Sequence, residues 1–427
     1  MNAEPPPEPT ALRTAPSTAS KLSKMLTLKS GIRTVPPEVT LELARVTARS
    51  LGVSRVTDTT RLDRIGIPVF ASVRPNAIDG SLCVNAGKGT RPIEAQVGAY
   101  MEAIEFAMAE PGAAGVEVEK VDWREILDAR RRPEAIAELC PMPRKGVDPR
   151  VEMECVVAEE ITERRNTILP AELVFSPFIP SSGQRIFGCS TNGLASGNTV
   201  TEATLHGLLE VIERDVISFH HVRDSSRLVI PESLPPFALH SLDQFKEAGC
   251  AICIRALPNC FGIPVFETDI WDPASTGLLS LTGGTGCHLL PEIALMRAIT
   301  EAAQSRLTVI HGGRDDLAKR AERFDDRGDR AALAAKRFHS LSSNETRVRY
   351  EEVRAPLAEP HSIQDALNGI IALLLEAGIT QVCRVALAPP TKDLHVVRVV
   401  VPRLEYFERD MPRVGPRLYQ YIYERTS

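Results

Sequence analysis

The sequence has no long apolar run and no strong excess of charge of either sign. Its 427 residues include 50 lysines and arginines against 55 aspartates and glutamates, a formal net charge of −5 at pH 7. A membrane-spanning helix needs about 20 predominantly apolar residues, and a nucleic-acid-binding domain usually carries a basic cluster. We therefore expect neither a membrane nor a nucleic acid as a partner. With 43% apolar and 25% charged residues, the composition is that of a globular protein.

Cysteine is sparse as well. Nine cysteines, an odd number, are spread thinly over the chain, which is not the pattern of a disulfide framework and indicates a reducing, cytoplasmic location. Cys250 and Cys253 form the one close pair. No second pair follows to complete a zinc site, and residues three apart in a strand point to opposite faces. We expect both to be buried core cysteines.

Common nucleotide-binding motifs are missing too. The sequence has no GxxxxGK followed by Ser or Thr, which excludes a Walker-type phosphate loop, and no GxGxxG after a strand. The first 20 residues are rich in proline and lack the apolar core of a secretory signal. We expect residues 1–20 to be a disordered leader and residues 21–427 to form the catalytic domain.

Strand-like and helix-like patterns alternate without a strict βαβ order, which predicts an α/β protein of the mixed α+β kind with mixed sheets. Strands are expected at residues 65–75, 81–87, 151–161, 172–179, 252–257, 265–272, 382–389 and 395–404. Helices are expected at residues 36–52 and 363–378, and within 87–110, 189–215 and 291–313. The highly charged segment 314–337 is expected to form a solvated helix pair.

Three glycine-rich stretches, at residues 87–89, 189–198 and 282–289, each lead into one of these helices. We interpret them as loops, because glycine lets backbone N–H groups approach phosphate oxygens and a helix N-terminus favours negative charge.

The helices that follow these stretches carry grouped charges. At about 100° per residue, Glu202, Glu210 and Glu213 fall on one side of their helix, next to an apolar stripe. That stripe consists of Leu205, Leu208, Leu209, Ile212 and Val216. Glu102 and Glu105 share a side of the first helix. Grouped carboxylates near basic residues are the parts of a magnesium–triphosphate site, although a solvated acidic face is the alternative interpretation.

Three long motifs resemble the hallmark blocks of the YcaO family. They are GKGTRPIEAQVGAYMEAIE at residues 87–105, STNGLASGNTVTEATLHGLLEVIERD at 190–215 and GTGCHLLPEIALMRAITEAAQSR at 284–306. The motifs stand in the family's order, and the resemblance covers residues 25–425. It implies a YcaO-like fold with a non-Walker site for ATP and Mg²⁺, used to activate a backbone amide of a peptide or protein by O-phosphorylation.

The resemblance also implies roles for individual residues. The expected metal ligands are Glu102, Glu105, Glu202, Glu210, Glu213 and Glu301. The expected nucleotide-binding residues are Arg33, Thr40, Lys88, Asn198, Arg214 and Arg297, and the expected catalytic residues are Glu202, Glu213, Arg214 and Arg297. The first block departs from the family's usual pattern at Gly98 and Phe106, where a serine and an arginine are usual, which puts the phosphate contacts there in question.

The resemblance leaves the product open between two branches of the family. Azoline-forming members cyclise a side chain onto the preceding amide and typically end in PxPxP, whereas this sequence ends in YQYIYERTS. We also expect no extra N-terminal leader-binding domain of the kind that fused members carry. We therefore expect a stand-alone, thioamide-forming enzyme that acts with a TfuA-like partner on a precursor peptide or protein, with a homodimer left open. A non-catalytic scaffold is the third alternative.

Overall fold

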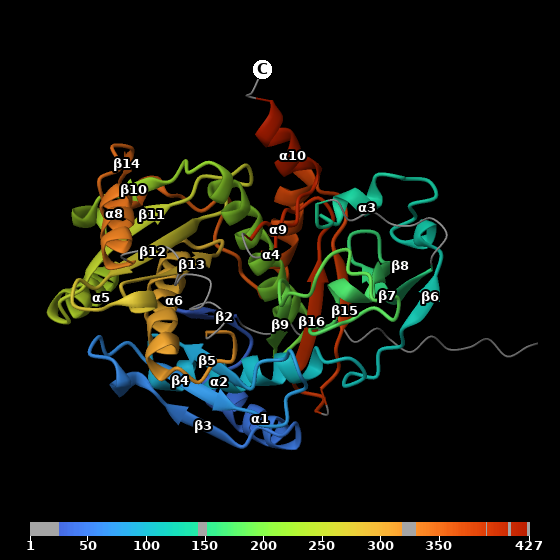
Figure 1. Cartoon of the computed structure of the whole chain (residues 1–427), viewed down its shortest axis with the longest axis horizontal. Helices are drawn as coiled ribbons and strands as arrows, with labels where there is room; N and C mark the ends of the chain where they lie inside the picture. Colours follow the sequence, from blue (N-terminus) through green and yellow to red (C-terminus); the bar gives the residue numbers. More distant parts are fainter. Residues whose placement is uncertain (1–24, 144–151, 318–329, 390, 409–410, 425–427) are drawn as a thin grey trace, which may run out of the picture.

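The computed structural model describes residues 25–143, 152–317, 330–389, 391–408 and 411–424. The leader expected at residues 1–20 lies outside this part of the chain. The structure is a mixed arrangement of helices and mostly antiparallel sheets, which confirms the predicted fold class (Figure 1). None of the helices in the described ranges is long and apolar enough to cross a membrane.

The N-terminal part forms a small antiparallel sheet in the order β3-β4-β5, with α1 and α2 packed together beside it (Figure 1). Its elements are α1 (Pro37–Ser50), β3 (Arg55–Asp58), β4 (Val69–Val73), β5 (Val84–Lys88) and α2 (Pro92–Met108). The strands β1 (Leu26–Leu28) and β2 (Gly31–Arg33) form a separate hairpin that precedes α1. A proline at the start of α1 and of α2 agrees with the preference of helix N-termini for a residue that needs no N–H partner.

A second sheet has the order β13-β12-β11-β10-β14, antiparallel except between β10 and β14. Its strands are β10 (Arg227–Val229), β11 (Ala251–Ala256), β12 (Val265–Trp271), β13 (Leu281–Cys287) and β14 (Arg347–Val348). The helices α5 (Pro236–Glu247), α6 (Pro291–His311) and α8 (Arg330–Ser342) pack against it. Residues 318–329 of the charged segment lie outside the described ranges. Residues 331–337, the described end of that segment in α8, are exposed or half-buried, as expected, whereas Phe338 and Leu341 beyond it are buried against this sheet.

The third sheet has the order β6-β7-β15-β16-β9, with β8 on the other edge of β7. Its strands are β6 (Glu119–Val121), β7 (Met153–Glu160), β8 (Arg165–Pro170), β9 (Leu194–Gly197), β15 (Cys383–Ala386) and β16 (His395–Val400). The helices of this part are α3 (Ala135–Glu138), α4 (Val200–Val222), α9 (Ile363–Glu376) and α10 (Pro416–Tyr423). α4 contacts β9, β16 and α9, and all five predicted stripe residues of α4 are buried in the core they share.

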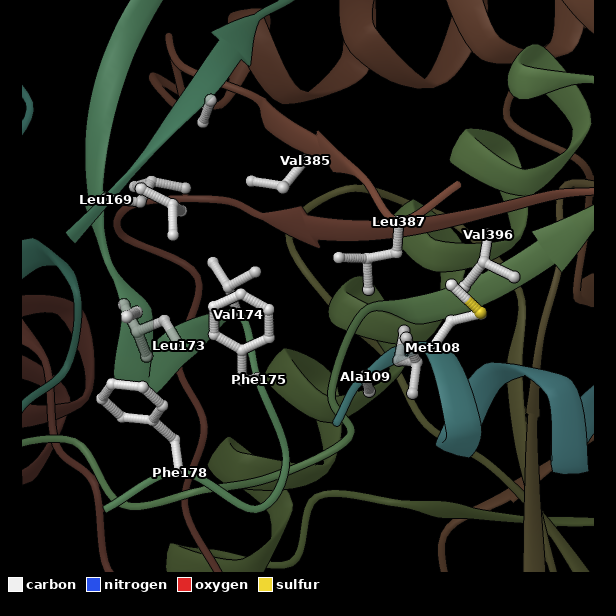
Figure 2. Close-up of a cluster of buried hydrophobic side chains, with 14 of the residues drawn as sticks. Met108, Ala109, Leu169, Leu173, Val174, Phe175, Phe178, Val385, Leu387 and Val396 are labelled. Atoms are coloured by element: carbon white, nitrogen blue, oxygen red, sulfur yellow. The ribbon is translucent and has the colours of Figure 1, made fainter. Parts of the chain in front are cut away.

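The strand predicted at residues 172–179 is wrong. Only a 3₁₀ turn, Ala171–Leu173, is regular there, and the segment then runs without a partner strand. The Glu172 carboxylate accepts hydrogen bonds from the N–H groups of Ile186, Phe187 and Gly188 at 2.7–3.0 Å, so a loop replaces the β ladder. Figure 2 shows that the apolar side chains of this segment still fill the core, next to those of β15, β16 and the end of α2.

The glycine-rich stretches are loops only in part: residues 89, 189–193, 198 and 288–289 lie outside the strands, and the remaining residues form strands. Gly87 lies in β5, residues 194–197 form β9, and residues 281–287 form β13. A Cβ atom on Gly87 would lie 2.1 Å from the Ala95 oxygen of α2, and one on Gly286 would lie 2.1 Å from the Ala294 oxygen of α6. The glycines are therefore required for close packing of each strand against the helix that follows it, which also weakens the predicted phosphate-loop role.

Cys250 and Cys253 are both buried, as predicted, and all nine cysteines are free thiols.

Candidate functional site

A cavity of about 720 Å³ lies where the strand–helix units meet. Residues of α2, α4 and α6 line it together with the β1–β2 hairpin, β5 and β9. All twelve residues that the sequence predicts for the site are among its lining: Arg33, Thr40, Lys88, Glu102, Glu105, Asn198, Glu202, Glu210, Glu213, Arg214, Arg297 and Glu301. The structure thus brings together residues that lie far apart in the sequence.

The start of α4 is tied to the N-terminal hairpin. Thr199 caps the helix by accepting a hydrogen bond from the Glu202 N–H at 3.1 Å. The Glu202 carboxylate accepts hydrogen bonds from the N–H and the hydroxyl of Thr34, at 3.0 and 2.6 Å, and its Oε1 lies 3.9 Å from Nε of Arg33. Nearby, the Thr40 hydroxyl donates to Oδ1 of Asn198 at 2.7 Å. These contacts fix the hairpin and α1 over one end of the cavity.

His206 holds Arg33 in this position. The Nη1 group of Arg33 contacts Nε2 of His206, and Nδ1 of His206 lies 3.3 Å from the Ser196 carbonyl. Burial, assisted by Arg33 and Arg297, holds the pKa of His206 well below its usual value, so the ring is neutral at pH 7. These partners assign the proton to Nδ1, which donates to Ser196, and leave Nε2 to accept from Arg33.

The carboxylates of α2 and the middle of α4 lie in an acidic part of the cavity. Glu102 accepts a hydrogen bond from the Ala86 N–H at 3.0 Å, and Glu105 accepts one from the Ser196 hydroxyl. Burial raises the pKa of Glu105 to about 8, with a contribution from Glu102, although the Ser196 bond opposes the shift. Burial likewise raises the pKa of Glu210 to about 7, against the effect of Arg214. For these acids the effect of burial on the pKa outweighs that of the nearby cations.

The opposite balance holds beside α6. Glu301 pairs with Lys88. Burial would raise the pKa of Glu301, but the positive charges of Lys88 and Arg214 outweigh burial and hold this pKa well below its usual value. The Thr285 hydroxyl of β13 donates to Glu213 at 2.8 Å. Nε of Arg297 is buried and has no hydrogen-bond partner within the described ranges. A buried, unpaired guanidinium N–H facing a cavity is costly unless an anion binds there.

Sequence reasoning missed several residues of this site. Thr34, Ser196 and Thr285 donate hydroxyl hydrogen bonds to the predicted acids, and single hydroxyl residues in loops and strands gave no signal. Arg314 also lines the cavity, where its guanidinium is held by Asp316 at 2.7 Å. The sequence did not indicate Arg314 as a site residue, because it begins the charged segment that we expected to be solvated.

Known proteins resemble this chain in sequence and in fold. The sequence model of the family described as YcaO cyclodehydratase, ATP- and Mg²⁺-binding, matches residues 86–405. An uncharacterized protein of Methanothermobacter thermautotrophicus is 37% identical over 402 residues, covering 91% of this chain and 99% of its own. A Rhizobium leguminosarum bv. trifolii protein, named only as uncharacterized and in the tfuA 3′ region, is 33% identical over 403 residues, covering 87% of this chain and 88% of its own. The chain belongs to the YcaO family.

Solved structures agree with this YcaO assignment. YcaO from Methanopyrus kandleri bound with AMPPCP and Mg²⁺ has a TM-score of 0.73 at 24% identity, covering 92% of this chain and 99% of its own. A heterocyclase in complex with substrate and cofactor has a TM-score of 0.71 at 20% identity, covering 92% of this chain and 56% of its own. At these identities the structures support the fold, while the family match supplies ATP and Mg²⁺ as the cofactors of this protein.

The residues present suit these YcaO cofactors. Within the described ranges, no three acidic, cysteine or histidine side chains converge on one point as a finished metal site. Mg²⁺ is usually held by only one or two carboxylates together with phosphate oxygens, so a preformed protein cage is not required. Burial raises the pKa of Glu105 to about 8 and that of Glu210 to about 7, so a bound cation would favour their ionised forms, and Nε of Arg297 offers an unpaired donor for an anion.

Gly98 and Phe106, the two departures from the YcaO pattern, both lie on α2 at the cavity. A Cβ atom on Gly98 of α2 would lie 3.2 Å from the Gly87 Cα atom of β5, so close packing favours glycine there. Phe106 lines the cavity and brings no charge. The nearby acid Glu102 instead experiences the positive charge of Arg314, which counteracts the effect of burial on its pKa.

Proposed function

We propose that this YcaO protein uses ATP and Mg²⁺ to activate a backbone amide of a peptide or protein and replaces its carbonyl oxygen by sulfur. The observation that carries the proposal is the convergence of all twelve predicted residues on one cavity. Acidic and basic side chains divide that cavity into a part suited to a metal ion and a part suited to phosphates. A non-catalytic scaffold would give no reason to keep several buried like charges together.

The cavity assigns roles to its residues under this proposal. Glu102, Glu105, Glu202, Glu210, Glu213 and Glu301 would hold Mg²⁺. Arg33, Thr40, Lys88, Asn198, Arg214 and Arg297 would bind the nucleotide and its phosphates. The charges of Arg214 and Arg297 would also stabilise the negative charge that develops during phosphoryl transfer. Glu202 and Glu213 would orient these groups, because hydroxyls from neighbouring elements fix both carboxylates.

The chemistry of the bound cofactors is phosphoryl transfer to the amide oxygen, which converts a poor leaving group into phosphate. Hydrosulfide adds to the amide carbon, the carbonyl oxygen leaves as phosphate, and the C=S bond forms while the amide nitrogen is retained. For each amide, one ATP and one hydrosulfide thus give one thioamide, one ADP and one phosphate, with the sulfur in the thioamide and the carbonyl oxygen in the phosphate. The protein itself supplies no nucleophile in this scheme; it binds, orients and excludes water.

Support for the thioamide product comes from the Rhizobium relative named for the tfuA 3′ region. A TfuA-like protein is accordingly the partner that we propose. The heterocyclase among the similar structures favours the second candidate, an azoline-forming cyclodehydratase, in which a side chain of the substrate attacks the same activated amide.

Intact-mass analysis separates the two candidates. The protein, a TfuA-like partner from the same gene neighbourhood, the adjacent candidate peptide, ATP, Mg²⁺ and sulfide are incubated together, and reactions without sulfide or without ATP serve as controls. We expect an ATP- and sulfide-dependent increase in peptide mass, because sulfur is heavier than oxygen. A sulfide-independent loss of water would establish the azoline product, and no change with ATP hydrolysis intact would contradict both.

A further inference from the structure

Strand β7 has a gap in its pairing on one edge. β8 pairs with β7 from Cys155 to Glu160. β6 also pairs with Cys155, and β15 with Glu159, so both strands must lie on the edge opposite β8. β6 covers only residues 153–155 of that edge and β15 only residues 159–160. Residues 156–158 therefore face no strand there within the described part of the chain.

The backbone groups of Val157 point into this gap. The Ile161 N–H donates to the Val382 carbonyl at 2.9 Å, on the side of β15. Because backbone groups alternate between the two edges of a strand, those of Glu159, Val157 and Cys155 point to the same side as those of Ile161. Glu159 faces Arg384 and Cys155 faces Glu119, but no strand in the described ranges faces Val157. The backbone groups of Cys155 should accordingly point away from β8. Its partner on β8 is Pro170, which has no N–H to donate, and this agrees with the assignment.

A groove opens beside the gap. It has a volume of about 270 Å³, and its lining includes Val116, Val121, Val157, Ile168, Glu117 and Glu119. The Val157 side chain is 53% exposed, although it lies within a sheet. Glu117 and Glu119 are exposed beside these apolar side chains. The groove therefore combines unpaired backbone groups, an apolar surface and negative charge.

We propose that an extended segment of the polypeptide substrate adds to β7 at this gap as a short strand. Its backbone would pair with Val157, an apolar side chain would enter the groove, and basic side chains beside it would face Glu117 and Glu119. This mode combines main-chain hydrogen bonds for affinity with side-chain pockets for selectivity. The inference rests on the proposed function in that it takes a polypeptide as the substrate.

The position of the gap suits a substrate that is held at one place and modified at another. Three strand intervals separate β7 from β9, which lines the ATP cavity (Figure 1). At about 4.8 Å per interval the offset across the sheet is about 14 Å, or about four to five extended residues. The bound segment would thus leave a residue a few positions away free to reach the cavity.

The test is a fluorescence-anisotropy titration with a labelled, acetylated hexapeptide, Lys-Val-Val-Val-Lys-Val, whose two lysines lie on the same face of a strand as the valine midway between them. Its fully N-methylated analogue keeps the side chains and charge but has no backbone donors. The variants are Val157→Lys and the double variant Glu117→Lys/Glu119→Lys. The charge-matched control is Glu247→Lys/Glu376→Lys, which changes two exposed acids on α5 and α9. Circular dichroism and ATP binding verify that each variant is folded.

We expect saturable binding that both groove variants weaken about tenfold or more, since repulsion replaces attraction at the groove, while the control pair leaves it unchanged. Equal binding of the N-methylated analogue would overturn strand addition, and equal binding to the groove variants would overturn the location. If the groove variants instead dissociate a dimer in light scattering, a second copy occupies the groove. If binding is detected only after residues 1–20 are removed, the chain's own N-terminus occupies it. Either result contradicts the proposal.

These measurements need no catalytic turnover. Hexapeptide binding that depends on the groove, in a protein that modifies no peptide mass, would contradict the proposed function and leave the docking site intact. Sulfide-dependent modification with the same KM for its peptide in wild type and groove variants would contradict the docking site and leave the proposed function intact.

Discussion

At the scale of single residues, the carboxylates of the cavity differ because their neighbours differ. Glu105 and Glu210 have raised pKa values chiefly because they are buried, and the arginines near Glu210 do not offset its burial. The pKa of Glu301 is lowered because Lys88 and Arg214 outweigh its burial. A metal ion near the first pair would replace a proton, whereas near Glu301 it would compete with an existing cation. The same residue type therefore contributes two different kinds of site within one cavity.

Replacing Glu213 by Gln is expected to abolish ATP turnover while leaving the fold intact. Gln keeps the volume and an oxygen that can accept the Thr285 hydroxyl, but it removes the negative charge beside Arg214. Steady-state phosphate release measures the loss, and circular dichroism and thermal unfolding report the fold. Glu376→Gln, on the exposed face of α9, is the matched control. Full turnover in Glu213→Gln would remove this residue from the catalytic set.

A second prediction at this scale concerns stability in acid and His288. Burial, with Arg297 and Arg33 nearby, lowers the pKa of His288 to about 3, and its Nδ1 accepts the Leu290 N–H at 3.0 Å. The folded pKa lies below the ordinary value of about 6.5, so this residue's contribution to stability is complete above pH 6.5 and is lost as the pH falls towards 3.

His288→Asn retains an acceptor near the position of Nδ1 but does not titrate. Relative to this variant, the wild type should lose about 2 kcal/mol of its free energy of unfolding between pH 6.5 and pH 5, at about 1.4 kcal/mol per pH unit. Urea unfolding at the two pH values measures the difference. A wild-type minus variant difference that stays constant with pH would show that His288 is protonated as readily in the folded chain as in the unfolded one.

At the scale of elements, periodicity and motif patterns predicted the helices well and the glycine-rich strands poorly. The apolar stripe of α4 faces the core and its acidic side faces the cavity, as their spacing predicts. The glycines of β5, β9 and β13 resemble turn residues in a sequence, because turn formation and close packing both select glycine. Only the position of the neighbouring helix, such as Ala95 of α2 against Gly87, distinguishes the two.

The contacts that hold the site could not be predicted from spacing. Ser196 donates to Glu105, which is 91 residues away, and Thr34 donates to Glu202, which is 168 residues away. A single hydroxyl residue has no periodic pattern that indicates such a partner. By contrast, eight of the twelve residues predicted for the cavity are charged residues on α2, α4 and α6 inside the long motifs, so the resemblance grouped them before the fold was known.

Packing of β13 against α6 leads to a prediction with an internal control. A Cβ atom on Gly286 would lie 2.1 Å from the Ala294 oxygen, whereas one on Gly283, in the same strand, would lie 3.3 Å from the Thr268 oxygen. Gly286→Ala should therefore lower the free energy of unfolding by about 3 kcal/mol or more, because helix or strand must move. Gly283→Ala should cost much less. Urea unfolding of both variants tests the comparison, and equal losses would show that close strand–helix packing does not require glycine.

At the scale of the whole molecule, the cavity is assembled from parts of the chain that belong to different sheets. α2 follows β5 of the N-terminal sheet, α6 follows β13 at one edge of the second sheet, and α4 follows β9 at one edge of the third (Figure 1). Each strand–helix unit brings some of the acids or cations, and no unit has the complete set. A ligand in the cavity would contact all three units at once.

ATP and Mg²⁺ together should therefore stabilise the entire fold, and either one alone should do so much less. The acids of the cavity repel phosphates unless a cation binds, and Mg²⁺ without phosphate lacks the oxygens that complete its coordination. With ATP at 100 times its Kd in the presence of Mg²⁺, linkage gives about 2.7 kcal/mol of added stability. Differential scanning calorimetry with ATP, Mg²⁺, both, or ATP with EDTA measures the shift in Tm.

Arg297→Met, which removes the unpaired donor, should reduce the shift, whereas Val157→Lys in the distant groove should retain it. An equal shift with ATP and EDTA would show that the nucleotide binds without the metal and that the acidic residues have another purpose.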